Sequence, residues 1–304
     1  MNVLSRQQLT TYYERYKTSE VIFNKEIREV TGLLTKQVCL KCMGKLWPCI
    51  IYAASLQMVK VLVNTKSGLM QSLQEANNGA NVRFCFKGNE GEDPVIFFVA
   101  VRSIGYMPYR GSKDMAMITL QFVQQAPDYL IGVLGRILDT TANSEGTSKR
   151  RGERVIITSE TQRMLGIVSK ETSVSVQGVP RQCILRDISF YGAKIIIMGL
   201  ANFLNDREAV LRIDFEEPRE SYFLKGKFCH SETVEGRKDL IAMGMSFYDD
   251  LIPMKYKIRI NAYITQVRAV NRIDTSALVE ASQEGSPCAS QTVQAEDGIP
   301  QPDT

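Results

Sequence analysis

Residues 183–197 read Cys-Ile-Leu-Arg-Asp-Ile-Ser-Phe-Tyr-Gly-Ala-Lys-Ile-Ile-Ile, and this stretch is the most informative in the chain. Two runs rich in β-branched residues, 183–187 and 194–198, flank a short segment that holds Ser189 and Gly192, which is typical of two strands joined by a tight turn. Similar short runs recur at residues 45–63, 82–87, 95–101, 115–123, 155–157, 209–215, 222–229 and 241–247. The sequence therefore predicts a mainly β protein.

Four segments have the pattern of helices instead, and they lie at residues 5–18, 67–75, 127–138 and 253–268. In the last of them, apolar and aromatic residues recur at helical spacing, which predicts a face that packs against the preceding strands. The residues of this face are Tyr256, Ile260, Tyr263, Ile264 and Val267.

Two short strings in the second half carry ligand chemistry. Arg150 and Arg154 form an R-x-x-x-R string, and their guanidinium groups can pair bidentately with phosphate oxygens or with the O6 and N7 acceptors of guanine. Lys149 and Arg151 add positive charge at the same place, where they either contact phosphate or remain solvated. This string suits an anionic ligand.

The second string is D-x-S-x-x-G at Asp187, Ser189 and Gly192. Asp187 can accept hydrogen bonds from the N1 and N2 donors of guanine, and Ser189 can donate or accept. Gly192 has no side chain to block a close approach of the ligand to the backbone. Taken alone, the string is also compatible with an ordinary turn.

Together these residues resemble the PilZ domain, a family that binds the bacterial second messenger cyclic di-GMP. The resemblance covers roughly residues 149–270 and includes Cys183 to Leu185 before the turn, residues 193–197 after it, and the run Gly244-Met245-Ser246-Phe247 before a helix. It implies a small antiparallel β-barrel with a C-terminal helix. The run 159–177 lengthens the gap between the two motifs compared with the family.

The first half contains a weaker copy of the same pattern. Residues 114–122 parallel residues 239–247, and residues 49–58 parallel residues 183–192. We therefore expect two β-barrels, each ending in an α-helix, after a short N-terminal helix. In the first copy Ser55 matches Ser189, but Ala53 replaces Asp187 and Met58 replaces Gly192. The region 27–33, aligned here with the arginine string, has one arginine, so we expect no nucleotide binding by this copy.

The polarity of the chain suggests domain boundaries. We expect a PilZ-like N-terminal domain at residues 1–138, a linker at 139–148, a PilZ domain at 149–270 and a disordered acidic tail at 271–304. From Ile273 onward there are six acidic residues and no Lys or Arg, so residues 1–272 carry +10 when the tail's −6 is removed from the net +4 of the chain. A basic body suits an anionic ligand, and nucleic acid remains an alternative.

Motifs and residue spacing argue against a metal site, an enzyme and a membrane protein. Cys39-x-x-Cys42 lacks the second ligand pair of a zinc site, so we expect no metal, and His230 is the one histidine. Common enzyme motifs are absent, so we expect a binding protein without catalytic residues or a cofactor. No apolar run approaches a membrane span and the N-terminus has no signal-peptide pattern, so we expect a cytoplasmic protein.

The resemblance also implies a mechanism. We expect a mobile arginine segment that closes over cyclic di-GMP, changes the arrangement of the two barrels and signals to a protein partner. The family resemblance suggests motility or envelope processes for that partner, such as flagellar machinery. The alternative is a basic β-barrel protein that binds nucleic acid, although aromatic residues interleaved with Lys and Arg are not obvious in the sequence.

Overall fold

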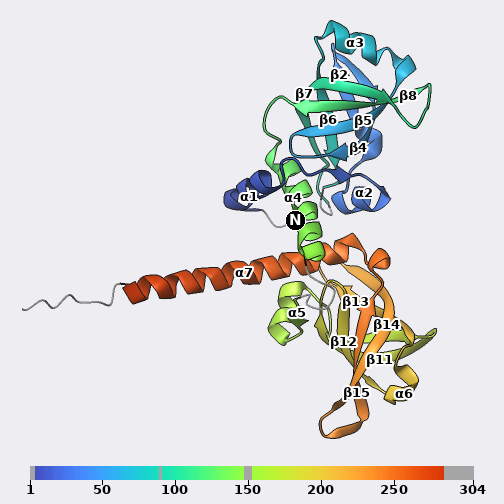
Figure 1. Cartoon of the computed structure of the whole chain (residues 1–304), viewed down its shortest axis with the longest axis vertical. Coiled ribbons are helices and arrows are strands. Elements are labelled where there is room, and N and C mark those ends of the chain that lie inside the picture. The colour runs from blue at the N-terminus through green and yellow to red at the C-terminus, as the bar shows by residue number, and fades with distance from the viewer. Residues whose placement is uncertain (1–3, 89–90, 147–152, 284–304) are drawn as a thin grey trace, which may run out of the picture. The chain divides into compact units, whose positions relative to one another are not determined.

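Eight strands of the first half form one curled antiparallel sheet in the computed structural model, which describes residues 4–88, 91–146 and 153–283 (Figure 1). In sheet order they are β1 (Val21–Ile22), β4 (Ile50–Ala54), β5 (Met58–Asn64), β8 (Met115–Phe122), β7 (Val95–Pro108), β6 (Gly79–Phe86), β2 (Cys39–Cys42) and β3 (Lys45–Pro48). Buried and exposed residues alternate along β6 and β8, as expected for strands with one face on a core.

The second half builds a closed six-stranded barrel with one additional strand. The order is β9 (Val155–Ile156), β11 (Val179–Ile188), β12 (Gly192–Met198), β15 (Arg237–Phe247), β14 (Glu220–Val234), β13 (Glu208–Phe215) and β10 (Glu171–Val176), and pairing of β10 with β11 closes the barrel. The predicted mainly β fold is confirmed. The first sheet differs in one respect. Its β3 and β4 are separate strands, whereas the corresponding strand of the second half, β11, is continuous.

The two sheets have the same topology, which agrees with a duplicated fold. A β-bulge lies between Ile51 and Ala53 where β4 pairs with β5, and the same irregularity lies between Leu185 and Asp187 where β11 pairs with β12. A second pair of bulges follows in β7 and β14. Because a bulge resets which face each side chain takes, these matched irregularities fix the alignment of the two halves residue by residue.

Matched short helices support this alignment. Helix α2 (Lys25–Thr31) is capped by the side chain of Asn24 and ends at the left-handed residue Gly32, and α5 (Ser159–Leu165) is capped by Thr158 and ends at left-handed Gly166. The run 159–177, which lengthens the gap between the two motifs, contains α5 and the strand β10, and the first half has their counterparts α2 and β2.

The remaining helices are α1 (Arg6–Tyr16), α3 (Leu69–Glu75), α4 (Asp128–Gly146), α6 (Ala201–Leu204) and α7 (Met254–Gln283), with single 3-10 turns at Thr35–Gln37, Thr65–Ser67 and Asp249–Leu251. Two segments that we expected to be irregular are helical in part. Residues 139–146 of the expected linker belong to α4, and residues 271–283 of the expected tail belong to α7. The other linker and tail residues, 147–148 and 284–304, lie outside the described residues.

The polar end of α4 is helical because its side chains have partners. Asp139 is buried and accepts a hydrogen bond from the hydroxyl of Tyr16 on α1 at 3.0 Å. Burial, together with the nearby Asp139 carboxylate, raises the pKa of Tyr16 to about 12. A segment that looks like a linker in sequence is therefore part of a packed helix pair.

Cys39 and Cys42 lie three residues apart on β2, so their side chains point to opposite faces of the sheet. Cys42 belongs to the core, where its thiol lies 3.3 Å from the carbonyl oxygen of Ser72. Among the described residues, no helix is both long and apolar enough to cross a membrane.

Candidate functional site

The turn between β11 and β12 presents the D-x-S-x-x-G string. Asp187 pairs with Lys194 on one side and with Ile156 of β9 on the other, directly after the bulge that follows Leu185. Its side chain is 13% exposed, so the carboxylate sits at the barrel surface with limited solvent access. The bulge therefore sets the direction of this carboxylate.

Ser189 is held inside the turn by three hydrogen bonds. Its backbone N–H donates to the carbonyl of Gly192 at 2.8 Å, and its hydroxyl donates to the same oxygen at 3.3 Å. The hydroxyl of Tyr256, on α7, donates to the carbonyl of Ser189 at 2.8 Å. Burial raises the pKa of Tyr256 far above the usual tyrosine range, so the phenol remains a neutral donor. Helix α7 thus fixes the conformation of the turn.

Gly192 is required by the packing of strands. A Cβ atom at this position would lie 2.5 Å from the carbonyl oxygen of Met245 on β15, which is closer than real side chains allow. The sequence argument assigned the glycine to a close approach of ligand. The structure adds a reason that is independent of any ligand, namely the close approach of β12 and β15.

Arg154 is the described member of the arginine string. It directly precedes β9, whose pairing with β11 brings its guanidinium within 3.0 Å of the Asp187 carboxylate. The Arg154 side chain is 47% exposed, so it remains accessible from solvent. Lys149, Arg150 and Arg151 lie outside the described residues. The structure therefore joins one residue from each motif at a single surface position.

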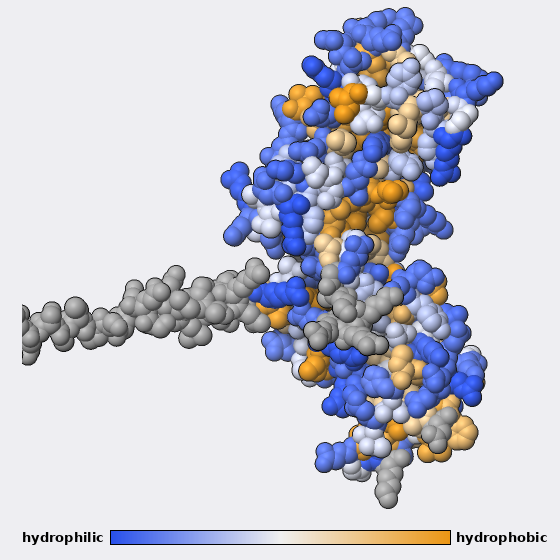
Figure 2. All heavy atoms as spheres, in the orientation of Figure 1, coloured by the Kyte–Doolittle hydropathy of each residue, from blue (hydrophilic) through white to orange (hydrophobic). Residues whose placement is uncertain are grey.

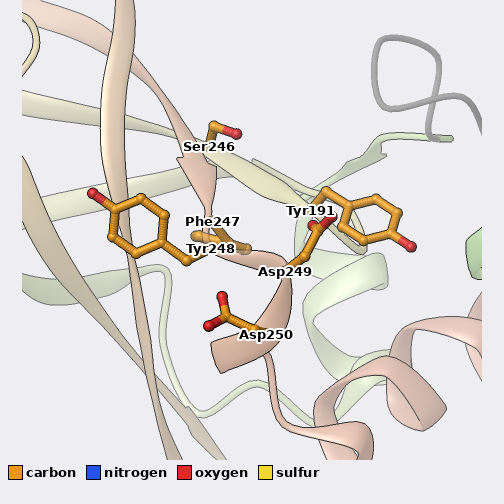
Figure 3. Close-up of a pocket in the computed structure, with 6 residues that line it drawn as sticks. All are labelled: Tyr191, Ser246, Phe247, Tyr248, Asp249 and Asp250. Atoms are coloured by element: carbon orange, nitrogen blue, oxygen red, sulfur yellow. The ribbon is translucent and has the colours of Figure 1, made fainter.

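A shallow hollow of about 340 Å³ adjoins the turn (Figure 3). Its lining residues are Tyr191, Ser246, Phe247, Tyr248, Asp249 and Asp250. The ammonium of Lys257 lies 5.2 Å from the centre of the Tyr191 ring. Sequence reasoning missed Tyr191 as a site residue, although it lies within the D-x-S-x-x-G string. Asp249 and Asp250 are the first two residues of the 3-10 turn that follows β15, a position that no motif marks.

The corresponding turn of the first half has other residues. Ser55 is conserved in position, and its hydroxyl accepts hydrogen bonds from the backbone N–H groups of Gln57 and Met58 at 3.2 and 3.1 Å. Ile22 pairs with Ala53 as Ile156 pairs with Asp187, which places Glu20 where the second half has Arg154. Glu20 forms an ion pair with Lys60 at 2.6 Å.

This register corrects the sequence alignment of the first half. The counterparts of Arg150 and Arg154 are Tyr16 and Glu20, not residues within 27–33. The reason is that α2 and α5 follow β1 and β9 in each half, so the region 27–33 matches α5 instead. The first half still lacks both guanidinium groups and the Asp187 carboxylate.

Comparisons with known proteins agree with this architecture. A model of the PilZN3 domain matches residues 7–141. A protein of Treponema denticola named "Cyclic di-GMP binding protein" is 43% identical over 269 residues, which cover 88% of this chain and 85% of the relative.

Two solved structures are also similar. The Borreliella burgdorferi PlzA protein in complex with c-di-GMP is 20% identical, with a TM-score of 0.39 over 84% of this chain and 98% of that chain. YcgR of Escherichia coli in complex with c-di-GMP is 11% identical, with a TM-score of 0.29 over 83% of this chain and 92% of that chain.

Proposed function

Because the chain belongs to the PilZ family, we propose that it is a receptor whose second barrel binds cyclic di-GMP. The relative from Treponema denticola, whose name describes this binding, supports the proposal. The observation that carries it is the contact of 3.0 Å between Arg154 and Asp187, because it brings together the two strings that suit this ligand.

In this proposal each side chain has a separate role. Arg150 and Arg154 pair with phosphate oxygens or with the O6 and N7 acceptors of guanine, and Asp187 accepts from the N1 and N2 donors. Ser189 holds the conformation of the β11–β12 turn through its hydrogen bonds to the Gly192 carbonyl, and Gly192 lets β12 approach β15 closely. Lys149 and Arg151 add positive charge near the phosphates.

The ion pair between Arg154 and Asp187 gives the site a defined ligand-free state. The half-exposed guanidinium can turn from the carboxylate to an incoming phosphate, while Asp187 keeps its orientation because β9 and β12 hold its backbone on both sides. Exchange of one charged partner for another limits the electrostatic cost of opening the site. No bond of the ligand is cleaved in this scheme.

The output is a change that a second protein detects. Closure of the arginine segment on the ligand would alter the arrangement of the two barrels, and the altered surface would be presented to a protein partner. We predict that the protein lies in the bacterial cytoplasm and that its partner acts in motility or envelope processes. A bacterial strain that lacks the gene should then lose its motility or envelope response to cyclic di-GMP.

Calorimetric titration of the full chain with cyclic di-GMP tests the proposal. We expect binding by the wild type and losses of ~100-fold in Arg150→Ala and Arg154→Ala, since charge-assisted contacts are removed, with a loss of ~10-fold in Asp187→Ala. Arg181→Ala is the matched control, because Arg181 is an exposed arginine on β11, six residues before Asp187 on that strand. Wild-type affinity in all three site variants would contradict the proposal.

Nucleic-acid binding is the second candidate function, and the +10 charge of residues 1–272 is the observation in its favour. A mobility shift with arbitrary single-stranded DNA or RNA, repeated at increasing salt, checks it. Salt-sensitive binding that does not respond to cyclic di-GMP would favour this function over the receptor.

A further inference from the structure

Strands β7, β6, β2 and β3 are neighbours in the first sheet, and one face of them points away from the core. The register places Phe98 of β7 opposite Arg83 of β6, and Lys41 of β2 opposite Leu46 of β3. Ile96 lies two residues before Phe98 on the same face. We refer to Ile96, Phe98, Arg83, Lys41 and Leu46 as the outer face.

The outer face exposes large apolar side chains. Ile96 is 45% exposed, Phe98 48% and Leu46 56%, although residues of these types are usually buried. Figure 2 shows apolar residues, in orange, reaching the surface of the first half among hydrophilic ones. Clustered exposure of this kind, bordered by polar residues, is typical of a surface that contacts another macromolecule.

The charged side chains of the outer face are all positive. The four strands contain no Asp or Glu, and Lys41, Arg83 and Arg102 supply the positive charge of this face. Within the described part of the chain, none of these three side chains forms an ion pair with a carboxylate. The ammonium of Lys41 lies 5.7 Å from the centre of the Phe98 ring, so charge and apolar surface are interleaved. A partner for this face must supply negative charge.

The second barrel provides an internal control for this interpretation. Phe223 of β14 lies opposite Arg212 of β13, as Phe98 lies opposite Arg83, and it is 61% exposed. There the basic residues have acidic neighbours within the same barrel. Arg212 pairs with Asp214 at 2.9 Å, Lys225 with Glu208 at 3.6 Å and Lys227 with Asp206 at 3.1 Å. Neutralisation is therefore possible in this architecture, and the basic residues of the outer face lack it among the described residues.

We propose that the outer face of the first half is a docking surface for an acidic protein segment that carries apolar side chains. Carboxylates of the segment pair with Lys41, Arg83 and Arg102, and its apolar side chains cover Ile96, Phe98 and Leu46. Single-stranded nucleic acid fits less well, because Ile96 and Leu46 are aliphatic and offer no π-face on which a base can stack.

Selection of random peptides of about 12 residues displayed on phage, with the full-length protein as target, tests the proposal. We expect enrichment of sequences that combine Asp or Glu with Leu, Ile or aromatic residues. Synthetic peptides of the enriched sequences should bind the wild type, and Arg83→Glu and Phe98→Ala should each weaken that binding by ~10-fold, as loss of one central interface contact does.

Arg212→Glu and Phe223→Ala, at the equivalent positions of the second barrel, are the matched controls and should leave peptide affinity unchanged. Cyclic di-GMP titration of every variant checks that the second barrel is intact. Enrichment of basic peptides, or equal binding by wild type and Arg83→Glu, would overturn the proposal. So would binding of a labelled oligo-dT that is lost in Arg83→Glu when no peptide is enriched.

Discussion

The two halves of this chain share one strand order but differ at the turn between their equivalent strands. The second half has Asp187 and Gly192 at the β11–β12 turn with Arg154 beside them, whereas the first half has Ala53 and Met58 at the β4–β5 turn. Glu20 takes the place of Arg154 and pairs with Lys60. Both halves keep the bulge and the serine at this turn. The charged residues, which we propose bind the ligand, are present in the second half alone among the described residues of the two turns.

The exposed sheet faces of the two halves differ in the opposite sense, because here the first half carries the charge that has no partner in the described chain. On the second barrel, Arg212 and Lys225 pair with acidic neighbours, whereas Lys41, Arg83 and Arg102 on the outer face of the first half have no ion pair among the described residues. One copy of the duplicated fold thus concentrates charge at a turn that suits a small ligand. The other concentrates it on a sheet face that suits a larger partner.

The largest expected effect comes from giving the second half the residue of the first. Arg154→Glu would place a second carboxylate next to Asp187 and reverse the charge facing the ligand phosphates. We expect cyclic di-GMP affinity to fall by ~1,000-fold, since loss of a charge pair costs 2–5 kcal/mol and repulsion is added. Glu20→Arg is the matched exchange in the first half and should change affinity little in the same calorimetric experiment.

Gly192→Ala tests the strand contact behind the site. A Cβ at this position would meet the Met245 carbonyl at 2.5 Å, so we expect a loss of ~1–3 kcal/mol in the free energy of unfolding. Urea unfolding followed by circular dichroism measures the loss. Gly105→Ala is the control, because a Cβ there meets nothing within 4 Å. Equal stability of the two variants would show that β12 and β15 can separate without cost.

Tyr256→Phe removes the hydroxyl that holds the Ser189 carbonyl. The buried acceptor would lose its hydrogen bond of 2.8 Å, and we expect a loss of ~1–2 kcal/mol in unfolding free energy. The first half has Leu130 at this position, counted from Pro127 and Pro253, which precede the two helices. If α7 positions the turn, cyclic di-GMP affinity should fall together with stability. Unchanged affinity would limit Tyr256 to a structural role.

Tyr16→Phe should have the smallest effect. Tyr16 aligns with Arg150 in the sequence, and its hydroxyl donates a hydrogen bond to Asp139, so its loss should cost ~1 kcal/mol of stability without changing ligand affinity. Because the pKa of Tyr16 is raised from 10.0 to about 12, the stabilisation is complete below pH 10 and is lost as the pH rises through 12. The free energies of unfolding of wild type and variant, measured with urea, should therefore converge as the pH rises from 10 to about 12.

Much of the architecture could be predicted because strand patterns and turn residues are local signals. The D-x-S-x-x-G string marked the β11–β12 turn, and the repeat of residues 49–58 and 183–192 marked its counterpart. Residues 139–146 of the expected linker are helical, because Asp139 is polar in sequence but accepts a hydrogen bond from Tyr16, more than 120 residues away in the chain. Local composition does not reveal a partner so distant in the chain.

The site was predicted less completely for a similar reason. Arg154 and Asp187 were named from their motifs, but their contact depends on pairing between β9 and β11, and β9 has only two residues. Tyr256 supports the turn from a helix 67 residues later, which no spacing rule indicates. The alignment of 27–33 with the arginine string failed because a short helix shifts the register, and the strand pairs were needed to correct it.

Amide hydrogen exchange of the full-length protein, with and without saturating cyclic di-GMP, tests most directly whether one half of the duplicated fold is the receptor. Protection should increase at the β11–β12 turn, residues 187–192, and remain unchanged at the equivalent β4–β5 turn, residues 53–58. Equal protection of both turns, or protection of residues 53–58 alone, would contradict the assignment of the ligand site to the second half.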